Sequence, residues 1–228
     1  MTALTVTHDL RKVVGAMNAM AKTTKWSIAK AINDTLWDVR SKEQEAMREV
    51  FDRPTPYILG AIGYNKATAV SLSGEIGIRD ELGGRHVSTL MPHIEGGGRE
   101  MRASERRLGR YWVPNIGVKY DAYGNVPGST VMKIMSQLKL AGDRYQNASD
   151  SSRSKRKRRG ETYFIMPDGS GIWVRRGAKL QPALLYAAPP NYEKRFPYYE
   201  IAEAAIDDRL WPNMRLRLGQ ALLQVGFR

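Results

Sequence analysis

The chain has 228 residues, of which 42% are hydrophobic, so it is long enough for one large domain or two small ones and too apolar for general disorder. It contains no cysteine, which excludes disulfides, thiolate metal ligands and a cysteine nucleophile. The formal net charge is +13, and residues 99–179 alone carry 18 basic against seven acidic side chains. A polyanionic partner is therefore expected at one region of the chain and not over its whole surface.

The first 56 residues are predicted to form a separate helical region. Apolar residues recur at helical spacing over residues 10–21 and again over residues 28–50. Thr23-Thr24 lies either between two amphipathic helices or inside one long helix. Pro54 and Pro56 end the helical region, because proline removes a backbone donor and restricts the residue before it.

Residues 57–228 are predicted to form a second domain, which begins with extended segments. Val70, Leu72, Ile76 and Ile78 alternate with polar residues, which predicts a half-buried strand within 66–79. Residues 90–98 are expected to be extended and to end in a glycine hinge. A short helix rich in arginine is predicted over 99–110.

The remaining elements of this domain complete an α+β pattern. Asp168-Gly169 between two β-rich runs predicts a β-hairpin near 162–175, and residues 181–188 predict a further strand. A short helix is expected near 131–138, and a C-terminal helix from residue 198 that Pro212 breaks or kinks. The predicted fold is therefore α+β, with long N-terminal amphipathic helices, a central antiparallel sheet and a C-terminal helix.

Two basic segments are the candidate contact sites for DNA or for an acidic partner protein. A helix over 99–110 would place Arg99, Arg102 and Arg106 on one face, although ion pairs at a subunit interface explain these residues equally well. The second segment is a predicted loop at 150–160, in which like charges repel one another unless an anion is near. The predicted contact residues are Arg102, Arg106, Arg110, Arg153, Lys155, Arg156, Lys157, Arg158 and Arg159. Since no aromatic residue is interleaved with the loop, contact with the phosphate backbone, independent of base sequence, is expected.

No catalytic, cofactor or metal site is predicted. His86, His93 and Glu95 lack the spacing of a helical zinc motif, and the glycines at 96–98 lack the lysine and hydroxyl residue of a P-loop. No nucleophile elbow or pair of catalytic carboxylates stands out. No apolar run approaches the roughly 20 residues that cross a bilayer, so no membrane partner is expected.

The order of several segments resembles the Z-type minor tail proteins of tailed phages, which belong to the broad group of neck and tail-completion proteins. The resemblance runs from about residue 25 onward. The matching segments are Ala31-Ile32-Asn33-Asp34-Thr35, the run Phe51-Asp52-Arg53-Pro54-Thr55-Pro56-Tyr57, and residues 90–99, 105, 123–127, 134–138, 171–173 and 182–186.

The resemblance implies a structural, non-enzymatic virion component at the head–tail junction, assembled in the host cytoplasm. Several copies would form a ring around the DNA channel, with phage connector, tail-tube or tail-terminator subunits as neighbours. Two other functions stay open: a free nucleic-acid-binding protein that uses segments 99–110 and 153–159, and a virion-associated enzyme such as a nuclease or a peptidoglycan hydrolase.

Overall fold

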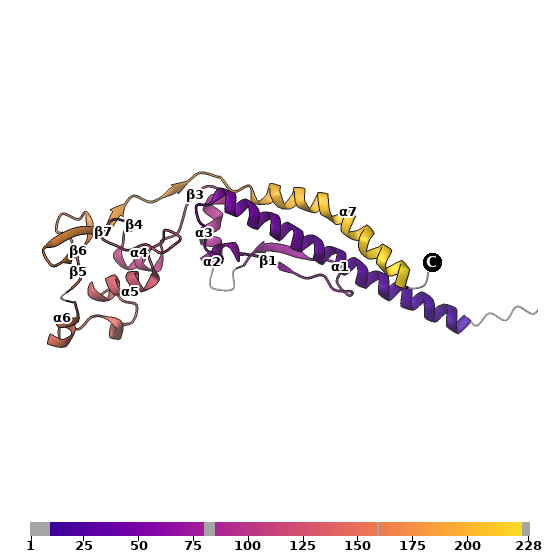
Figure 1. Ribbon diagram of the computed structural model, residues 1–228, viewed down its shortest axis with the longest axis horizontal. Coiled ribbons are helices and arrows are strands. Elements are labelled where there is room, and N and C mark those ends of the chain that lie inside the picture. Colours follow the sequence, from indigo (N-terminus) through magenta and orange to yellow (C-terminus); the bar gives the residue numbers. More distant parts are fainter. Residues whose placement is uncertain (1–9, 80–84, 159, 225–228) are drawn as a thin grey trace, which may run out of the picture. The chain divides into compact units, whose positions relative to one another are not determined.

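A computed structural model describes residues 10–79, 85–158 and 160–224, which form an α+β protein of two compact units (Figure 1). Unit 1 takes in the described residues of segments 1–51, 56–87 and 196–228, and unit 2 those of segments 52–55 and 88–195. The division differs from the boundary expected at residue 56, because the C-terminal helix packs on the N-terminal helix. No helix in the described ranges has the length and hydropathy needed to cross a membrane.

Unit 1 is built on two long helices, α1 (Leu10–Val50) and α7 (Tyr198–Gln224), which lie side by side and run antiparallel (Figure 1). Of the two arrangements left open by the sequence, one continuous 41-residue helix is the one observed. The Thr23 and Thr24 hydroxyls donate to the carbonyls of Ala19 and Met20, each at 2.9 Å, so the helix accommodates this pair without a break.

Close packing of small side chains and a set of side-chain hydrogen bonds together hold α1 and α7 against each other. Val39 is fully buried against Ala202 and Ala205, whose small side chains let the two helices approach. Directly after Pro212, the Asn213 side-chain amide donates to Asp38 at 3.0 Å, and one turn further along Arg217 donates to Asp34 at 2.6 Å. These bonds hold α7 to α1 beyond the proline, and α7 continues through Pro212 instead of breaking there.

The rest of unit 1 is the short helix α2 (Pro56–Leu59) and a two-stranded antiparallel sheet of β1 (Ile62–Asn65) and β2 (Glu75–Ile78). The strand expected within 66–79 is therefore limited to its last residues, and Val70 is 98% exposed. The reason is a local turn in which Ser71 donates its amide to the Thr68 hydroxyl at 3.0 Å and accepts the Thr68 amide at 2.8 Å. Such bonds compete with a strand ladder.

Unit 2 contains a four-stranded antiparallel sheet in the order β4-β7-β6-β5. The strands are β4 (Tyr111–Pro114), β5 (Thr162–Ile165), β6 (Gly171–Arg176) and β7 (Lys179–Ala187). The hairpin predicted near 162–175 is confirmed, with Phe164 paired to Trp173 and Gly169 in the left-handed region at φ 73°. Helix α5 (Gly128–Gln137) packs on the sheet through Ile134 and Met135, which are buried with Ile172 and Leu184.

Two expectations for the start of unit 2 are wrong. Residues 90–94 are not extended but form the end of helix α3 (Arg85–Ile94), since Leu90 and Ile94 lie one turn apart and are both about 1% exposed. The expected helix over 99–110 is only α4 (Ala103–Leu108). Two two-residue strands, β3 (Gly97–Gly98) and β8 (Asn191–Tyr192), pair next to it.

Candidate nucleic-acid interface

The basic segment expected as a loop at 150–160 contains a helix, α6 (Ser152–Arg158). Ser151 caps its start: the side-chain oxygen accepts the Ser154 amide at 3.2 Å, and the carbonyl accepts the Lys155 amide at 2.9 Å. The expectation of a loop was wrong because lysine and arginine are good helix formers and a serine cap precedes them.

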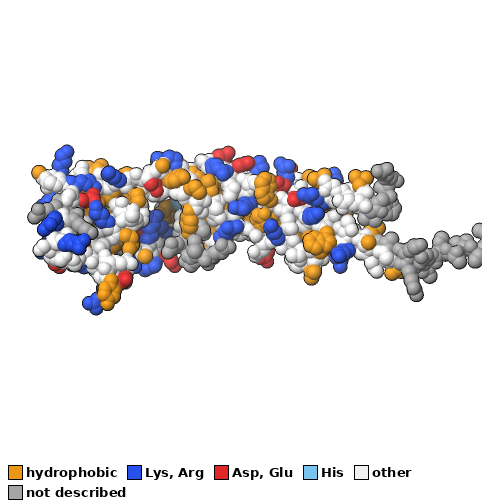
Figure 2. All heavy atoms as spheres, turned by 60° about the horizontal axis from the view of Figure 1, so that its bottom comes forward, with side chains coloured by type: hydrophobic (Ala, Val, Ile, Leu, Met, Phe, Trp, Pro, Cys, Tyr) orange, Lys and Arg blue, Asp and Glu red, His pale blue; other side chains and the backbone are white. Residues whose placement is uncertain are grey.

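The cationic groups of α6 are available on its surface. Arg153, Lys155 and Arg156 are exposed. The side chains of Lys157 and Arg158, and the whole of Arg159, lie outside the described residues. Figure 2 shows Lys and Arg side chains over the part of unit 2 that holds α6 and the β5–β6 hairpin.

The segment that leads into α6 is tied to the end of α5. Lys139, held in the left-handed region at φ 62°, donates to Asp150 at 3.1 Å and also to the Ala148 carbonyl. The Ala148 amide donates to the Ser136 carbonyl at 3.0 Å. Because these bonds fix residues just before Ser151, the start of α6 has a defined position on unit 2.

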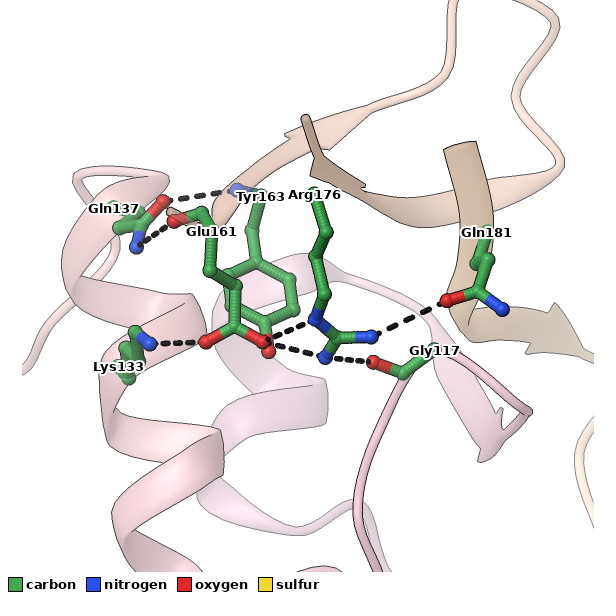
Figure 3. Close-up of polar contacts among 7 residues, drawn as sticks. All are labelled: Gly117, Lys133, Gln137, Glu161, Tyr163, Arg176 and Gln181. Atoms are coloured by element: carbon green, nitrogen blue, oxygen red, sulfur yellow. Dashed lines mark hydrogen bonds and ion pairs between the residues drawn. The ribbon is translucent and has the colours of Figure 1, made fainter. Parts of the chain in front are cut away.

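The segment that leaves α6 is held by Glu161, which lies between α5 and β6 (Figure 3). Its carboxylate accepts from Arg176 Nε at 2.9 Å and forms an ion pair with Lys133. Arg176 also donates to the carbonyl of Gly117 at 2.8 Å, which links this network to the loop after β4. Burial opposes ionisation of Glu161, but hydrogen bonds from Lys133 and Arg176 outweigh it and lower the pKa of Glu161 to about 2.

The second predicted basic segment is divided between structural and surface roles. The predicted helix face of Arg99, Arg102 and Arg106 does not form, because α4 begins only at Ala103, with Arg102 as its N-cap residue, and only Arg106 lies on the helix. Instead Arg99 forms a two-pronged ion pair with Glu105, with both N–O distances 2.6 Å and side-chain exposures of 13% and 0%. Glu105 also accepts the Arg102 amide at 2.7 Å, so this pair fixes the start of α4 and is not free for a ligand.

The predicted contact residues Arg102, Arg106 and Arg110 are exposed. Arg106 donates to the Met101 carbonyl at 2.6 Å, which holds its guanidinium near the helix start. Arg110 does not lie on the same helix, because α4 ends at Leu108 and is capped by Gly109 in the left-handed region at φ 65°.

Arg107 connects α4 with the segment before α6. A Cβ added at Gly142 would come within 2.3 Å of the Arg107 Nη2 atom, so the guanidinium lies directly against the Gly142 backbone. The next element is the 3-10 turn η1 (Arg144–Gln146), where Tyr145 is 89% exposed and the Arg144 guanidinium lies 5.9 Å from its ring centre. The basic surface of α4 therefore continues toward an exposed aromatic ring.

The sequence pattern did not point to Tyr145, because this residue lies outside the basic run at 153–159, which contains no aromatic residue. The signal was available as Asp143-Arg144-Tyr145, where the Asp143 carboxylate accepts the Tyr145 amide at 2.9 Å and shapes the turn. A cation beside an exposed ring is the combination that single-stranded nucleic-acid sites use.

The histidines do not form a metal site with their neighbours in the described ranges. His93 Nδ1 accepts from Arg195 Nε at 3.1 Å, and its ring meets Tyr192 edge-on at 4.8 Å. Burial, and then the charge of Arg195, lower the pKa of His93, so the neutral ring is favoured. No group of three His, Asp or Glu residues placed to bind a metal occurs among residues 10–79, 85–158 and 160–224.

Comparisons of the chain with protein-family models, with curated proteins and with solved structures find no match. The fold and the surface therefore define the protein's class: a two-unit α+β protein whose second unit presents an anchored basic helix. The phage resemblance stays a proposal that rests on the sequence segments alone.

Proposed function

We propose that this chain is a structural protein of a tailed-phage particle, placed in several copies at the head–tail junction around the DNA channel. Its neighbours would be connector, tail-tube or tail-terminator subunits, and its basic side chains would face the DNA backbone or an acidic neighbour. In this role the protein carries out no chemical reaction, and it is assembled into the virion in the host cytoplasm.

The observation that carries the proposal is the fixed presentation of a basic helix on unit 2. Arg153, Lys155 and Arg156 are exposed, while the residues before and after α6 are bonded to α5 and β6. A ring of such helices would contribute many weak phosphate contacts that act together. The mode of contact is independent of sequence, which suits a channel through which a whole genome passes.

Removal of the gene tests the structural role directly. Particles assembled without the protein should be heads and tails that fail to join, seen by electron microscopy, and the protein should copurify with complete virions. Joined, infectious particles that lack the protein would show that the proposed placement is wrong.

The backbone contact is tested on the purified protein with duplex DNA. Replacing Lys155 and Arg156 by glutamine should weaken binding and reduce the slope of log K against log salt by up to about 1.8, because each lost phosphate contact contributes about 0.9. Lys179→Gln, an exposed lysine at the β6–β7 turn, is the matched control and should leave the slope unchanged. If the double variant keeps the wild-type slope of log K against log salt, α6 does not contact the DNA backbone.

A second candidate function, a free nucleic-acid-binding protein, is favoured by the exposure of Tyr145 beside Arg144. An exposed aromatic ring can stack on an unpaired base, whereas the bases of an intact duplex are already stacked on one another. Tyr145→Ala should weaken binding of single-stranded DNA by about 1–3 kcal/mol, whereas Tyr145→Phe should keep it. If single-stranded binding is tight and depends on the ring while particles assemble without the protein, this second function replaces the first.

A further inference from the structure

The four-stranded sheet of unit 2 has one covered face and one open face. The strand residues that point toward α5 are buried in the core of this unit; they are Tyr163, Ile172, Val174 and Leu184. Figure 3 shows the Tyr163 ring on this side, where the Lys133 Nζ atom of α5 lies 6.0 Å from the ring centre. Because successive strand residues point to opposite faces, Phe164 and Trp173 lie on the other face of the sheet.

The open face carries apolar side chains that remain in contact with solvent. Phe164 and Trp173 are partly exposed, and so is Pro182, which pairs with Trp173 on β7. Elsewhere on this face, Leu180 is 41% exposed and Val113 is 49% exposed. A hydrophobic sheet face is normally buried against another layer, so this face is a candidate contact surface.

Two aromatic rings stand side by side on the open face. Phe164 of β5 and Trp173 of β6 are direct partners in the antiparallel pairing, and neighbouring strands lie about 4.8 Å apart. The indole Nε1 atom of Trp173 donates to the Ser170 hydroxyl at 3.1 Å, which fixes the direction of this ring. Aromatic rings on an antiparallel sheet are the platform on which single-stranded nucleic-acid modules stack successive bases.

The charges around the open face suit a polyanion. The guanidinium carbon of Arg175, an exposed residue, lies 5.7 Å from the centre of the Phe164 ring. None of the strands β4, β5, β6 and β7 contains an acidic residue. The basic helix α6 ends at Arg158, and β5 begins soon afterwards at Thr162, so the cations of α6 stand near one end of the aromatic pair. Rings for the bases and cations for the phosphates therefore occur together.

We propose that the open face of this sheet binds a single-stranded nucleic acid, with one base stacked on Phe164 and the next on Trp173. Arg175 and the exposed cations of α6 hold the phosphates of the same strand. The inference goes beyond the proposed function, in which α6 contacts the backbone of a duplex and no base is bound. It shares its ligand class with the second candidate function, but it places the bases on the sheet and not on Tyr145.

Two strands of equal charge test the stacking on the wild-type chain. Binding is measured by fluorescence anisotropy with a labelled oligothymidine of about 12 nucleotides and with an abasic strand of the same length. Both strands carry the same phosphates, so the difference in affinity reports the bases. The oligothymidine should bind at least about fivefold more tightly, which is the lower end of the range for a single stacked base. This comparison needs no variant and does not depend on how a variant folds.

Substitutions on the sheet then locate the stacking. Phe164→Leu and Trp173→Leu each remove a ring but keep an apolar side chain, and each should weaken oligothymidine binding at least about fivefold without changing binding of the abasic strand. Trp173→Phe keeps a ring and should retain the affinity. Arg175→Gln should reduce the slope of log K against log salt by about 0.7. Tyr120→Leu, at a 48% exposed aromatic residue in the loop after β4, is the matched control and should bind like the wild type.

Several results would overturn the inference. They are an abasic strand that binds as tightly as the oligothymidine, leucine variants that bind like the wild type, or an equal loss in Tyr120→Leu. A loss in Tyr145→Ala, with the leucine variants unchanged, would assign the stacking to the second candidate function instead. Particles that fail to assemble with Phe164→Leu, while strand binding is unchanged, would assign the open face to a neighbouring protein. The proposed function fails separately, through particles that join without the protein, so the outcomes are distinguishable.

Discussion

The side chain of Gln137, at the end of α5, takes the place of a neighbouring strand beside Tyr163 of the edge strand β5. Its Oε1 atom accepts the Tyr163 amide at 2.9 Å, and its Nε2 atom donates to the Glu161 carbonyl at 3.2 Å (Figure 3). A paired strand would satisfy the same two groups. The amide therefore blocks part of an edge that could otherwise pair with another chain.

Gln137→Ala should leave these two backbone groups without a protein partner. We expect the free energy of unfolding of unit 2 to fall by about 1–2 kcal/mol and aggregation on warming to increase, since an open edge invites strand pairing. Urea unfolding and light scattering on a temperature ramp measure the two effects. Met132→Ala, an exposed position of the same helix, is the control. A Gln137 variant that behaves like it would show that the edge is protected by something else.

The Glu161 network should make unit 2 sensitive to acid. The pKa of Glu161 is lowered to about 2, below its ordinary value of 4.5, because hydrogen bonds from Lys133 and Arg176 outweigh burial. Its contribution is fully present above about pH 4.5 and is lost as the pH falls toward 2. Glu161→Gln should therefore destabilise unit 2 at neutral pH by roughly 2 kcal/mol and flatten this acid dependence.

Urea unfolding between about pH 2.5 and about pH 6 measures that dependence. Glu193→Gln, at an exposed position of the same unit, serves as the matched control and should keep the wild-type slope. If the Glu161 variant keeps the slope as well, the ion pairs with Lys133 and Arg176 do not stabilise the fold.

Local patterns predicted those elements whose cause lies in a few neighbouring residues. Asp168-Gly169 predicted the hairpin because the turn needs a residue with φ above zero, and the helical spacing of Val131, Ile134, Met135 and Leu138 predicted a helix where α5 lies. The stripe in residues 28–50 likewise anticipated the buried Leu36, Val39 and Met47. The α+β fold class followed from these elements.

The failures have tertiary or competing local causes. Val70 was predicted to lie in a strand, but Thr68 and Ser71 form a turn there. Residues 153–158 were predicted to lie in a loop, but they are helical, and Ser151 caps the start of that helix. The basic residues also differ in role for reasons beyond spacing. Arg99 is an internal partner of Glu105, while Arg102 is exposed three residues later, and only the folded chain distinguishes them.

The sequence pattern did not indicate a buried acid in unit 1, which should make this unit less stable as the pH rises from about 4.5 to about 8. Glu43 of α1 is 0% exposed, and neither carboxylate oxygen has a hydrogen-bond partner among the described residues. Burial raises the pKa of Glu43 to about 8. The Tyr198 hydroxyl is similarly buried and unpaired, and the pKa of Tyr198 is raised to about 12 by burial and then by the charge of Glu43.

The sign of this second pH effect is opposite to that of Glu161. The protonated folded form of Glu43 is favoured, so the stability is fully present below about pH 4.5 and is lost as the pH rises through about 8. The loss is on the order of 4 kcal/mol. Glu43→Gln keeps the shape without the charge and should make unit 1 equally stable at both ends of this range.

Far-UV ellipticity during urea unfolding follows the two long helices and reports this difference. Glu49→Gln on the exposed side of α1 is the control, which should keep the wild-type pH dependence. A wild-type helical unit that is as stable at about pH 9 as at about pH 5 would mean that Glu43 finds a partner or water when ionised.

Two glycines of unit 2 should respond oppositely to the same added methyl group. Gly171 begins β6 at φ 147°, next to the register shift at Ile172, and a Cβ there would lie 2.3 Å from the Leu184 carbonyl oxygen of β7. Because that oxygen belongs to the backbone of a central strand, it cannot move without disturbing the sheet. Gly171→Ala should therefore destabilise unit 2 by about 3 kcal/mol or more.

Gly128 begins α5 with nothing within 4 Å of the added atom, so Gly128→Ala should stabilise the same unit by about 0.5–1 kcal/mol. Urea unfolding of the two variants beside the wild type measures both shifts, and an alanine tolerated equally at both positions would contradict the close approach of β6 to β7.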